Sequence, residues 1–153
     1  SMYDYCQDWS CIEYTTMPHP YRMSDAEAAV ERWRQGFEAQ ECIQYAITTA
    51  GGEMLGHVSL HDIHQYDHWA EVGYVLAPKA RGQGLATAAV KRLTEYGFEI
   101  GFRRIHAFIV VGNTASAKVV QRSGYELESV MRQSMTNRDG SQTDGWLYAK
   151  VID

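Results

Sequence analysis

Hydrophobic residues recur along the chain with two periods, one near 3.6 residues, typical of helices, and one of 2, typical of half-buried strands. Residues 24–40 follow the helical period and open with a capping box of Ser24 and Glu27. The apolar positions of this predicted helix are Ala28, Val30, Trp33 and Phe37.

The next part of the chain predicts strands. Residues 42–50 and 54–63 read as two strands joined by a hairpin turn at 51–53. A third strand is predicted over 70–77, where Pro78 ends it because proline has no N–H to donate.

Helices and strands then alternate. The pattern predicts a helix over 84–100 followed by Gly101, a residue type suited to a helix C-terminus. The apolar stripe of this helix consists of Leu85, Ala89, Leu93, Tyr96 and Ile100. A nearly continuous apolar run predicts a buried strand over 103–111, and a short helix is expected between Asn113 as its N-cap and Gly124.

Two final strands, about 125–135 and 144–151, flank a turn at 137–141. Antiparallel strands come first and strand–helix–strand units follow, so the order predicts an α+β (or α/β) sheet flanked by helices. A chain of 153 residues that is 45% hydrophobic suits a single domain, 1–153.

Charge and composition narrow the function classes. A formal net charge of −5 argues against a protein whose main task is to bind nucleic acid, and no apolar run is long enough to span a membrane. Three cysteines without a CxxC pair suit reduced thiols. These observations favour a cytoplasmic protein.

The glycine-rich stretch at 81–87 lies between a predicted strand and a predicted helix. The first N–H groups of a helix lack partners and carry a partial positive charge, so they attract anions. Gly82 and Gly84 allow a phosphate to approach the backbone, and Arg81 adds a cation. Neither a Walker loop nor a dinucleotide fingerprint is present. The alternative is a flexible helix start that binds nothing.

Two motifs carry a family resemblance. The run Arg81-Gly82-Gln83-Gly84-Leu85-Ala86 resembles the R/Q-x-x-G-x-G/A signature of the GNAT superfamily of N-acetyltransferases, and "GNTASAKVVQRSGYE" at 112–126 resembles that superfamily's second motif. Together with "EVGYVLAP" and the closing "DGWLYAKV", they are typical of the RimJ/RimL-like branch, which acetylates ribosomal-protein N-termini. The resemblance covers about residues 10–151.

The resemblance implies a GNAT-like fold, with a central, mixed and mostly antiparallel sheet that splays in the middle, between the strands at 72–77 and 103–111. It implies acetyl-CoA as the co-substrate and no metal. The implied cofactor-binding residues are Leu76, Arg81, Gly82, Gln83, Gly84, Leu85, Ala86, Thr87, Asn113 and Ser116. Because the chain before Ser24 is too short for the strand and helix with which the family opens, we expect the first strand to be missing, truncated or supplied otherwise.

Acetyl transfer also needs a base and a proton for the leaving thiolate. An α-amine with a pKa near 8 costs about 1.4 kcal/mol to deprotonate at pH 7, and a carboxylate can take its proton. Glu71 is the first candidate for this base, with a solvated or salt-bridged strand end as its alternative reading. Many GNAT enzymes offer the thiolate a tyrosine seven residues after the asparagine, but that position is Val120 here. The resemblance assigns the task to Ser116, which otherwise is a plain helix residue.

Four histidines invite a rival interpretation. His57, His61, His64 and His68 are spaced 4, 3 and 4, which on a helix would form a metal-binding face. They fall instead on a predicted strand and loop, where His57 or His61 is a candidate to relay a proton in the acceptor pocket. Tyr21, Trp33 and Trp69 are expected either to wall this pocket or to fill the core.

Two functions remain open from the sequence. The first is an acetyl-CoA-dependent N-acetyltransferase whose acceptor is a peptide N-terminus or a small amine. The second is a non-catalytic acyl-CoA-binding module that keeps the glycine-rich stretch at 81–87 as a phosphate loop. A homodimer is a further expectation, because dimers are common in this branch and symmetric pairing is the usual route to them.

Overall fold

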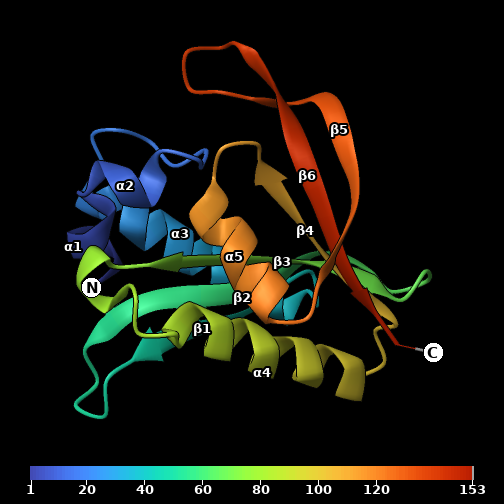
Figure 1. Ribbon diagram of the computed structural model, residues 1–153. Coiled ribbons are helices and arrows are strands. Elements are labelled where there is room, and N and C mark those ends of the chain that lie inside the picture. The colour runs from blue at the N-terminus through green and yellow to red at the C-terminus, as the bar shows by residue number, and fades with distance from the viewer. Residues whose placement is uncertain (153) are drawn as a thin grey trace.

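In the computed structural model, which describes residues 1–152, short N-terminal helices precede a long helix and a sheet with interspersed helices (Figure 1). The elements are α1 (Met2–Cys6), α2 (Trp9–Ile12), α3 (Met23–Glu38), β1 (Ile43–Thr48), β2 (Met54–His64), β3 (Trp69–Leu76), a 3-10 turn (Pro78–Ala80), α4 (Leu85–Glu99), β4 (Arg104–Val110), α5 (Thr114–Arg122), β5 (Glu126–Thr136) and β6 (Gln142–Val151). None of these helices is long and apolar enough to cross a membrane.

Within the described residues, the sheet has six strands in the order β1-β2-β3-β4-β6-β5. Every neighbouring pair is antiparallel except β3 and β4, which run parallel. Their register has three pairs, Trp69↔Arg104, Ala70↔Ile105 and Glu71↔His106, after which the strands separate. The predicted fold class, a mostly antiparallel sheet that splays in the middle, is therefore confirmed.

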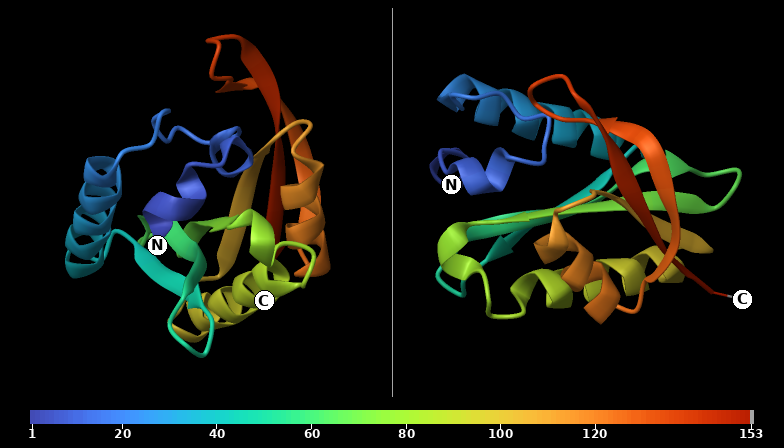
Figure 2. Two further views of the ribbon diagram at one scale, coloured as in Figure 1. Left: turned by 90° about the vertical axis from the view of Figure 1, so that its left-hand side faces the viewer. Right: turned by 45° about the horizontal axis from the view of Figure 1, so that its top comes forward.

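Helices cover both faces of the sheet. Figure 2 shows α3 over one face and α4 with α5 over the other. The core beneath α4 and α5 contains the fully buried Leu60, Val90, Ile105 and Val120. Each such side chain contributes about 1.5–3 kcal/mol through its removal from water. A second apolar cluster packs α1, α2 and α3 against the sheet.

Two short helices, α1 and α2, precede α3 in the part of the chain for which we expected the first strand to be missing, truncated or supplied otherwise. Within residues 1–152, no strand precedes β1, and the sheet begins at that strand. A buried hydrogen bond of 2.7 Å between the Tyr5 hydroxyl and Nδ1 of His57 ties α1 to β2. This contact fixes the N-terminal segment against the α3 side of the sheet.

The predicted start and apolar face of α3 were wrong in detail. The helix begins at Met23, and the carboxylate of Asp25 accepts a 2.8 Å hydrogen bond from the backbone N–H of Arg22, so Ser24 and Glu27 do not form the cap. Ala26 and Ala29 are the buried positions of the helix. Val30 and Phe37, expected on the inner face, are 55% and 60% exposed.

The predicted stripe of α4 is partly correct, because Ala89 and Tyr96 pack against the core. Leu93 is buried as expected, whereas Ile100 is 47% exposed and the inner face runs through Ala86, Val90 and Gly97. Small residues lie inward because α4 packs closely on the sheet: a Cβ at position 97 would lie 2.6 Å from a methyl group of Ile105. The buried side of α4 is therefore the one whose small side chains allow a close approach to the sheet, and not the one with the largest apolar side chains.

Candidate active site

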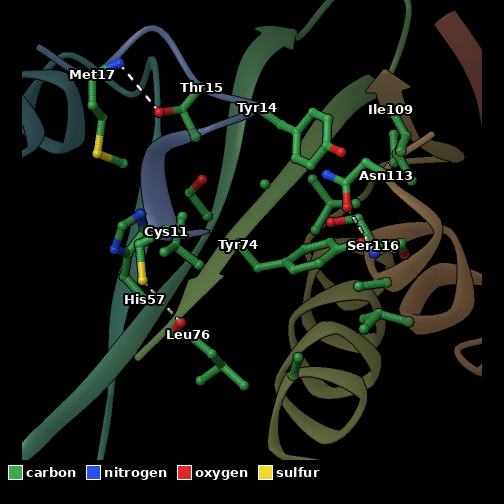
Figure 3. Close-up of a pocket in the computed structure, with 18 of the residues that line it drawn as sticks. Cys11, Tyr14, Thr15, Met17, His57, Tyr74, Leu76, Ile109, Asn113 and Ser116 are labelled. Carbon is green, nitrogen blue, oxygen red and sulfur yellow. Dashed lines mark hydrogen bonds between the residues drawn. The ribbon is translucent and has the colours of Figure 1, made fainter. Parts of the chain in front are cut away.

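The separation of β3 and β4 opens a V in the middle of the sheet. Glu71 on β3 and His106 on β4 are the last paired residues, so they lie at its apex. A cavity of about 1090 Å³ extends from this apex between the start of α4, the start of α5 and the N-terminal segment. Figure 3 shows Tyr74, Leu76, Asn113 and Ser116 around it.

The loop before α4 has the geometry of an anion cradle. Gly82 and Gly84 adopt φ values of +76° and +77°, which favour glycine, and Gly84 is the N-cap of α4. A Cβ at either position would meet nothing within 4 Å, so open space lies above the backbone here. The helix that follows has 15 residues and directs its unpaired N–H groups toward this space.

The remaining loop residues differ in their orientation. Leu85, Ala86 and Thr87 line the same cavity as the two glycines. Gln83 instead donates a 3.1 Å hydrogen bond to the carbonyl of Lys79, which closes the turn before the helix. Its contribution to the cradle is therefore to the shape of the loop.

The guanidinium of Arg81 is already engaged. It donates to the carbonyl of Leu76 at 3.1 and 3.2 Å, and to the hydroxyl and carbonyl of Ser10 at 2.8 and 3.2 Å. Arg81 thus ties α2 to the end of β3, and the carbonyl of Leu76 also lies 3.5 Å from Sγ of Cys11. A phosphate contact from Arg81 would require these hydrogen bonds to be exchanged.

Two cations that the sequence analysis missed line the cavity from α5. Lys118 and Arg122 are four residues apart, so they share one face of this helix. That spacing was the available signal that the two residues share a helix face, and the structure shows that this face lines the cavity. They place positive charge at a cavity whose loop arginine, Arg81, is hydrogen-bonded to other groups.

Asn113 and Ser116 lie at the opposite wall of the V. The side-chain oxygen of Asn113 caps α5 by accepting a 3.3 Å hydrogen bond from the Ser116 N–H. The Ser116 carbonyl accepts a 2.8 Å hydrogen bond from the hydroxyl of Tyr74 on β3. Val120 is fully buried in the core. The sequence analysis missed Tyr74 and also Tyr14, which projects from the N-terminal segment toward Asn113 (Figure 3).

Glu71 is not a solvated strand end, because its side chain is 20% exposed. Burial raises its pKa to about 7, with a further contribution from Asp62, while the backbone N–H of Phe108 opposes the rise. Its two oxygens each face an imidazole: Oε1 lies 3.8 Å from Nε2 of His61, and Oε2 lies 3.8 Å from Nε2 of His106. A carboxyl group that titrates near neutral pH is suited to accept a proton.

The four histidines of the sequence motif do not converge. His57 is hydrogen-bonded to Tyr5, and burial lowers its pKa to about 4. His64 stacks on Trp69 with ring centroids 4.0 Å apart. Of the four, it is His61 that reaches Glu71, so the proton-relay interpretation falls on His61 rather than His57.

The side of the cavity near α3 has polar and aromatic walls. Tyr21 and Trp33 line it, whereas Trp69 lies in a separate depression near His64. The hydroxyl of Tyr21 and Nε2 of Gln44 are buried without a hydrogen-bond partner among the described residues. Such groups are costly unless a ligand or water satisfies them.

An arginine from the opposite end of the chain holds the wall that carries Tyr14. Arg138, in the turn between β5 and β6, donates to the carbonyl of Ile12 at 2.9 and 3.0 Å and to the carbonyl of Met17. The right-hand view of Figure 2 shows this turn reaching toward the N-terminal helices. The segment between these two carbonyls is thereby fixed along the cavity.

Comparison with known proteins points to one family. The family described as "Acetyltransferase (GNAT) domain" matches residues 1–126. The putative ribosomal N-acetyltransferase YdaF of Bacillus subtilis (strain 168) is 31% identical over 110 residues, which are 71% of this chain and 60% of that protein. The ribosomal-protein-serine acetyltransferase of Escherichia coli (strain K12) is 32% identical over 102 residues, which are 66% of this chain and 56% of that protein.

Solved structures give the same fold. The microcin C7 self-immunity acetyltransferase MccE, in complex with acetyl-CoA and AMP, superposes with a TM-score of 0.91 at 23% identity, covering 99% of this chain and 85% of that chain. RimL, in complex with coenzyme A, superposes with a TM-score of 0.90, also at 23% identity, covering 99% and 87%. The chain spans less than two thirds of the length of the two curated relatives compared above.

Proposed function

The chain belongs to the acetyltransferase (GNAT) family, and on that premise we propose that it transfers the acetyl group of acetyl-CoA to a free α-amine of a protein or peptide. The observation that carries the proposal is that one cavity joins the parts such a transfer needs. These parts are the phosphate loop with the N–H groups at the start of α4, the edges of β3 and β4 where the two strands separate, and Glu71 at the apex between these strands.

Acetyl-CoA would bind along the V from the phosphate loop to the apex. Gly82 and Gly84 leave their backbone open to a pyrophosphate, and the N-terminus of α4 supplies the N–H donors. Lys118 and Arg122 add positive charge beside that loop. The amides of the pantetheine arm would pair with the backbone of β3 near Leu76, as an added strand does at a sheet edge.

Glu71 would take the proton from the acceptor amine, directly or through a water molecule. The free amine then attacks the thioester carbonyl carbon, and a backbone N–H of the splayed strands stabilises the resulting oxyanion. Collapse of this intermediate breaks the carbon–sulfur bond and releases coenzyme A as a thiolate. Because the pKa of Glu71 is about 7, the carboxylate is available at neutral pH and still binds a proton effectively.

The departing thiolate requires a proton or a hydrogen bond. We assign this role to the hydroxyl of Ser116, which lines the cavity and makes no hydrogen bond to any other residue within 1–152. Asn113 supports it by capping α5 and so holding Ser116 at the start of the helix. Tyr14 is a second hydroxyl on the same side of the cavity.

Two arguments support an α-amine as the acceptor. Two relatives, at 31% and 32% identity, are named for ribosomal substrates, whereas the spermidine N(1)-acetyltransferase of Escherichia coli (strain K12) is 26% identical. An α-amine also costs about 1.4 kcal/mol to deprotonate at pH 7, and a lysine side chain costs several times more. A single carboxylate at the apex is sufficient for the cheaper deprotonation.

The experiment is free-thiol release from acetyl-CoA with a panel of amines: peptides that begin with Ser or Ala, spermidine and an aminoglycoside. We expect turnover with the peptides and at least tenfold weaker acetyl-CoA binding in Gly84→Val, because a β-branched residue is strained at φ +77° and its side chain would occupy the cradle. Gly52→Val is the matched control, since Gly52 has φ +84° and lies in open space in the hairpin turn between β1 and β2.

The non-catalytic alternative gives a different result. A module that keeps the phosphate loop without the acid–base groups would bind acetyl-CoA tightly in calorimetry and release no thiol with any acceptor. That outcome, with Gly84→Val still weakening the binding, would replace the enzyme proposal by the binding-module proposal.

A further inference from the structure

Three titratable side chains form a row across the middle of the sheet. The register pairs His61 with Glu71 and Glu71 with His106, so the three residues lie side by side on adjacent strands β2, β3 and β4. Each imidazole directs Nε2 at one oxygen of the carboxylate, at 3.8 Å. The inference drawn from this row rests on the proposed function, in which Glu71 accepts the proton of the amine.

The two imidazoles differ in what lies behind them. The side chain of His106 is 10% exposed, and its Nδ1 is buried without a hydrogen-bond partner among residues 1–152. Within residues 1–152, no hydrogen-bonded group therefore stands ready to take a proton from Nδ1 of His106. The side chain of His61 is 38% exposed, and its Nδ1 lies 3.3 Å from the hydroxyl of Ser59.

The sheet is shaped to hold the His61 ring in place. Gly73 pairs with Ser59, and a Cβ at position 73 would lie 2.9 Å from Cε1 of His61 and 3.3 Å from the Ser59 hydroxyl. The absence of a side chain at position 73 makes the room in which the imidazole lies. Ser59 then fixes the orientation of the ring through Nδ1, which leaves Nε2 toward Glu71.

We propose that His61 is a positioning residue that receives from Glu71 the proton taken from the acceptor amine and releases it to solvent. In this step the O–H bond of the protonated Glu71 carboxyl breaks and an N–H bond forms at Nε2 of His61. That transfer regenerates the Glu71 carboxylate. The imidazolium then gives the Nε2 proton to water, which restores the neutral imidazole for the next turnover. No electrons are transferred and no co-reactant besides water is required.

The groups around His61 allow its imidazole to hold a proton briefly. Burial lowers the pKa of His61, and Asp62 on the same strand opposes this. An imidazole that holds a proton weakly releases it readily to water. The titratable groups that face His61 from the neighbouring strands are Glu71 on β3 and His106 on β4. The same cavity is also lined by the charged or titratable side chains of Cys11, Glu13, Tyr14, Tyr21, Asp25, Arg32, Cys42, His57, Tyr74, Arg81, Lys118 and Arg122.

The test is His61→Ala with a peptide acceptor, assayed with and without added imidazole. We expect kcat to fall at least tenfold with the KM for acetyl-CoA unchanged, and added imidazole to restore most of the lost rate, because a 38% exposed site admits the small base. His64→Ala, which removes an exposed imidazole stacked on Trp69, is the matched control and should neither lose activity nor respond to imidazole. An unchanged kcat in His61→Ala, or a loss that imidazole does not rescue, overturns the proposal.

A second variant tests the role of the pocket around the ring. Gly73→Ala should lower kcat by displacing His61, and it should cause no further loss in the His61→Ala background. An equal loss in both backgrounds would show that Gly73 does not act through His61.

Wild-type activity that EDTA abolishes and Zn²⁺ restores would instead make His61, Asp62 and Glu71 a metal site, because their ligand atoms lie within 4.8 Å of one another.

These results separate the inference from the proposed function. Turnover by the wild type together with full activity of His61→Ala removes the proton path and leaves the acetyltransferase proposal intact. A wild type that binds acetyl-CoA without turnover with any amine removes both.

Discussion

Replacing Glu71 by glutamine is expected to make the protein more stable and less active at the same time. The side chain is 20% exposed and its pKa is raised from 4.5 to about 7, chiefly by burial. Because the folded state favours the protonated carboxyl, this contribution to stability is fully present below about pH 4.5 and is lost as the pH rises through about 7.

The size of the stability change follows from the raised pKa of Glu71. Holding a charged carboxylate at a pKa of about 7 instead of 4.5 costs the folded state at most about 3 kcal/mol above pH 7. Glu71→Gln keeps the shape and removes the charge, so the free energy of unfolding should increase by up to that amount at pH 8 and change little at pH 4.5. For a chain of this length, the gain at pH 8 corresponds to a rise in Tm of about 6–12 °C.

Activity should move in the opposite direction. Loss of a general base lowers kcat by about 10²–10⁴-fold. In the wild type, kcat/KM should rise with pH up to about 7 and then level, and Glu71→Gln should lose this inflection. Glu126→Gln, which alters an exposed carboxylate on β5, is the control for both measurements.

Urea unfolding at pH 4.5 and pH 8, combined with thiol-release kinetics across the pH range, checks both halves of the reasoning. Equal stabilities of wild type and Glu71→Gln at pH 8 would show that the buried, charged carboxylate does not destabilise the folded state. Retention of the inflection near pH 7 in Glu71→Gln would show that another group is the base.

The remaining predictions concern the N-terminal segment. Arg138→Ala should raise the KM for the acceptor about tenfold and leave the KM for acetyl-CoA unchanged. The reason is that it removes charge-assisted hydrogen bonds, worth about 1.5–3 kcal/mol, that hold residues 12–17 along the cavity. Arg132→Ala on β5 is the control, and equal effects of the two variants would contradict the assignment. Tyr5→Phe should lower the free energy of unfolding by about 1–3 kcal/mol, since it leaves Nδ1 of the buried His57 without a partner. This is measured by urea unfolding, and a loss of kcat without loss of stability would place the Tyr5–His57 pair in the chemistry instead.

Much of the fold was predictable because local pattern and turn chemistry agree. The strands at 43–48, 54–64 and 69–76 follow the predicted ranges within one or two residues. The glycine loop before α4 and the cap at Asn113 were recognisable, since positive φ and capping depend on single residue types. The same two motifs identified the family correctly.

The parts of the site that sequence reasoning missed depend on tertiary geometry. The row through Glu71 exists because three strands share a register, which no local pattern specifies. The hydrogen bonds of Arg81 to Ser10, and of Arg138 to Ile12, join residues 71 and 126 positions apart. The exposed face of α3 was mispredicted because alanines pack where larger residues were expected.

The central claim is direct acetyl transfer to an amine at the apex between β3 and β4. Its most direct test is to measure, in one reaction with a peptide that begins with Ser, both the thiol released from acetyl-CoA and the peptide that gains one acetyl group at its α-amine. We predict that the two amounts are equal and that both fall together in Glu71→Gln. Thiol release without acetylated peptide, or no release despite tight acetyl-CoA binding, would contradict the account.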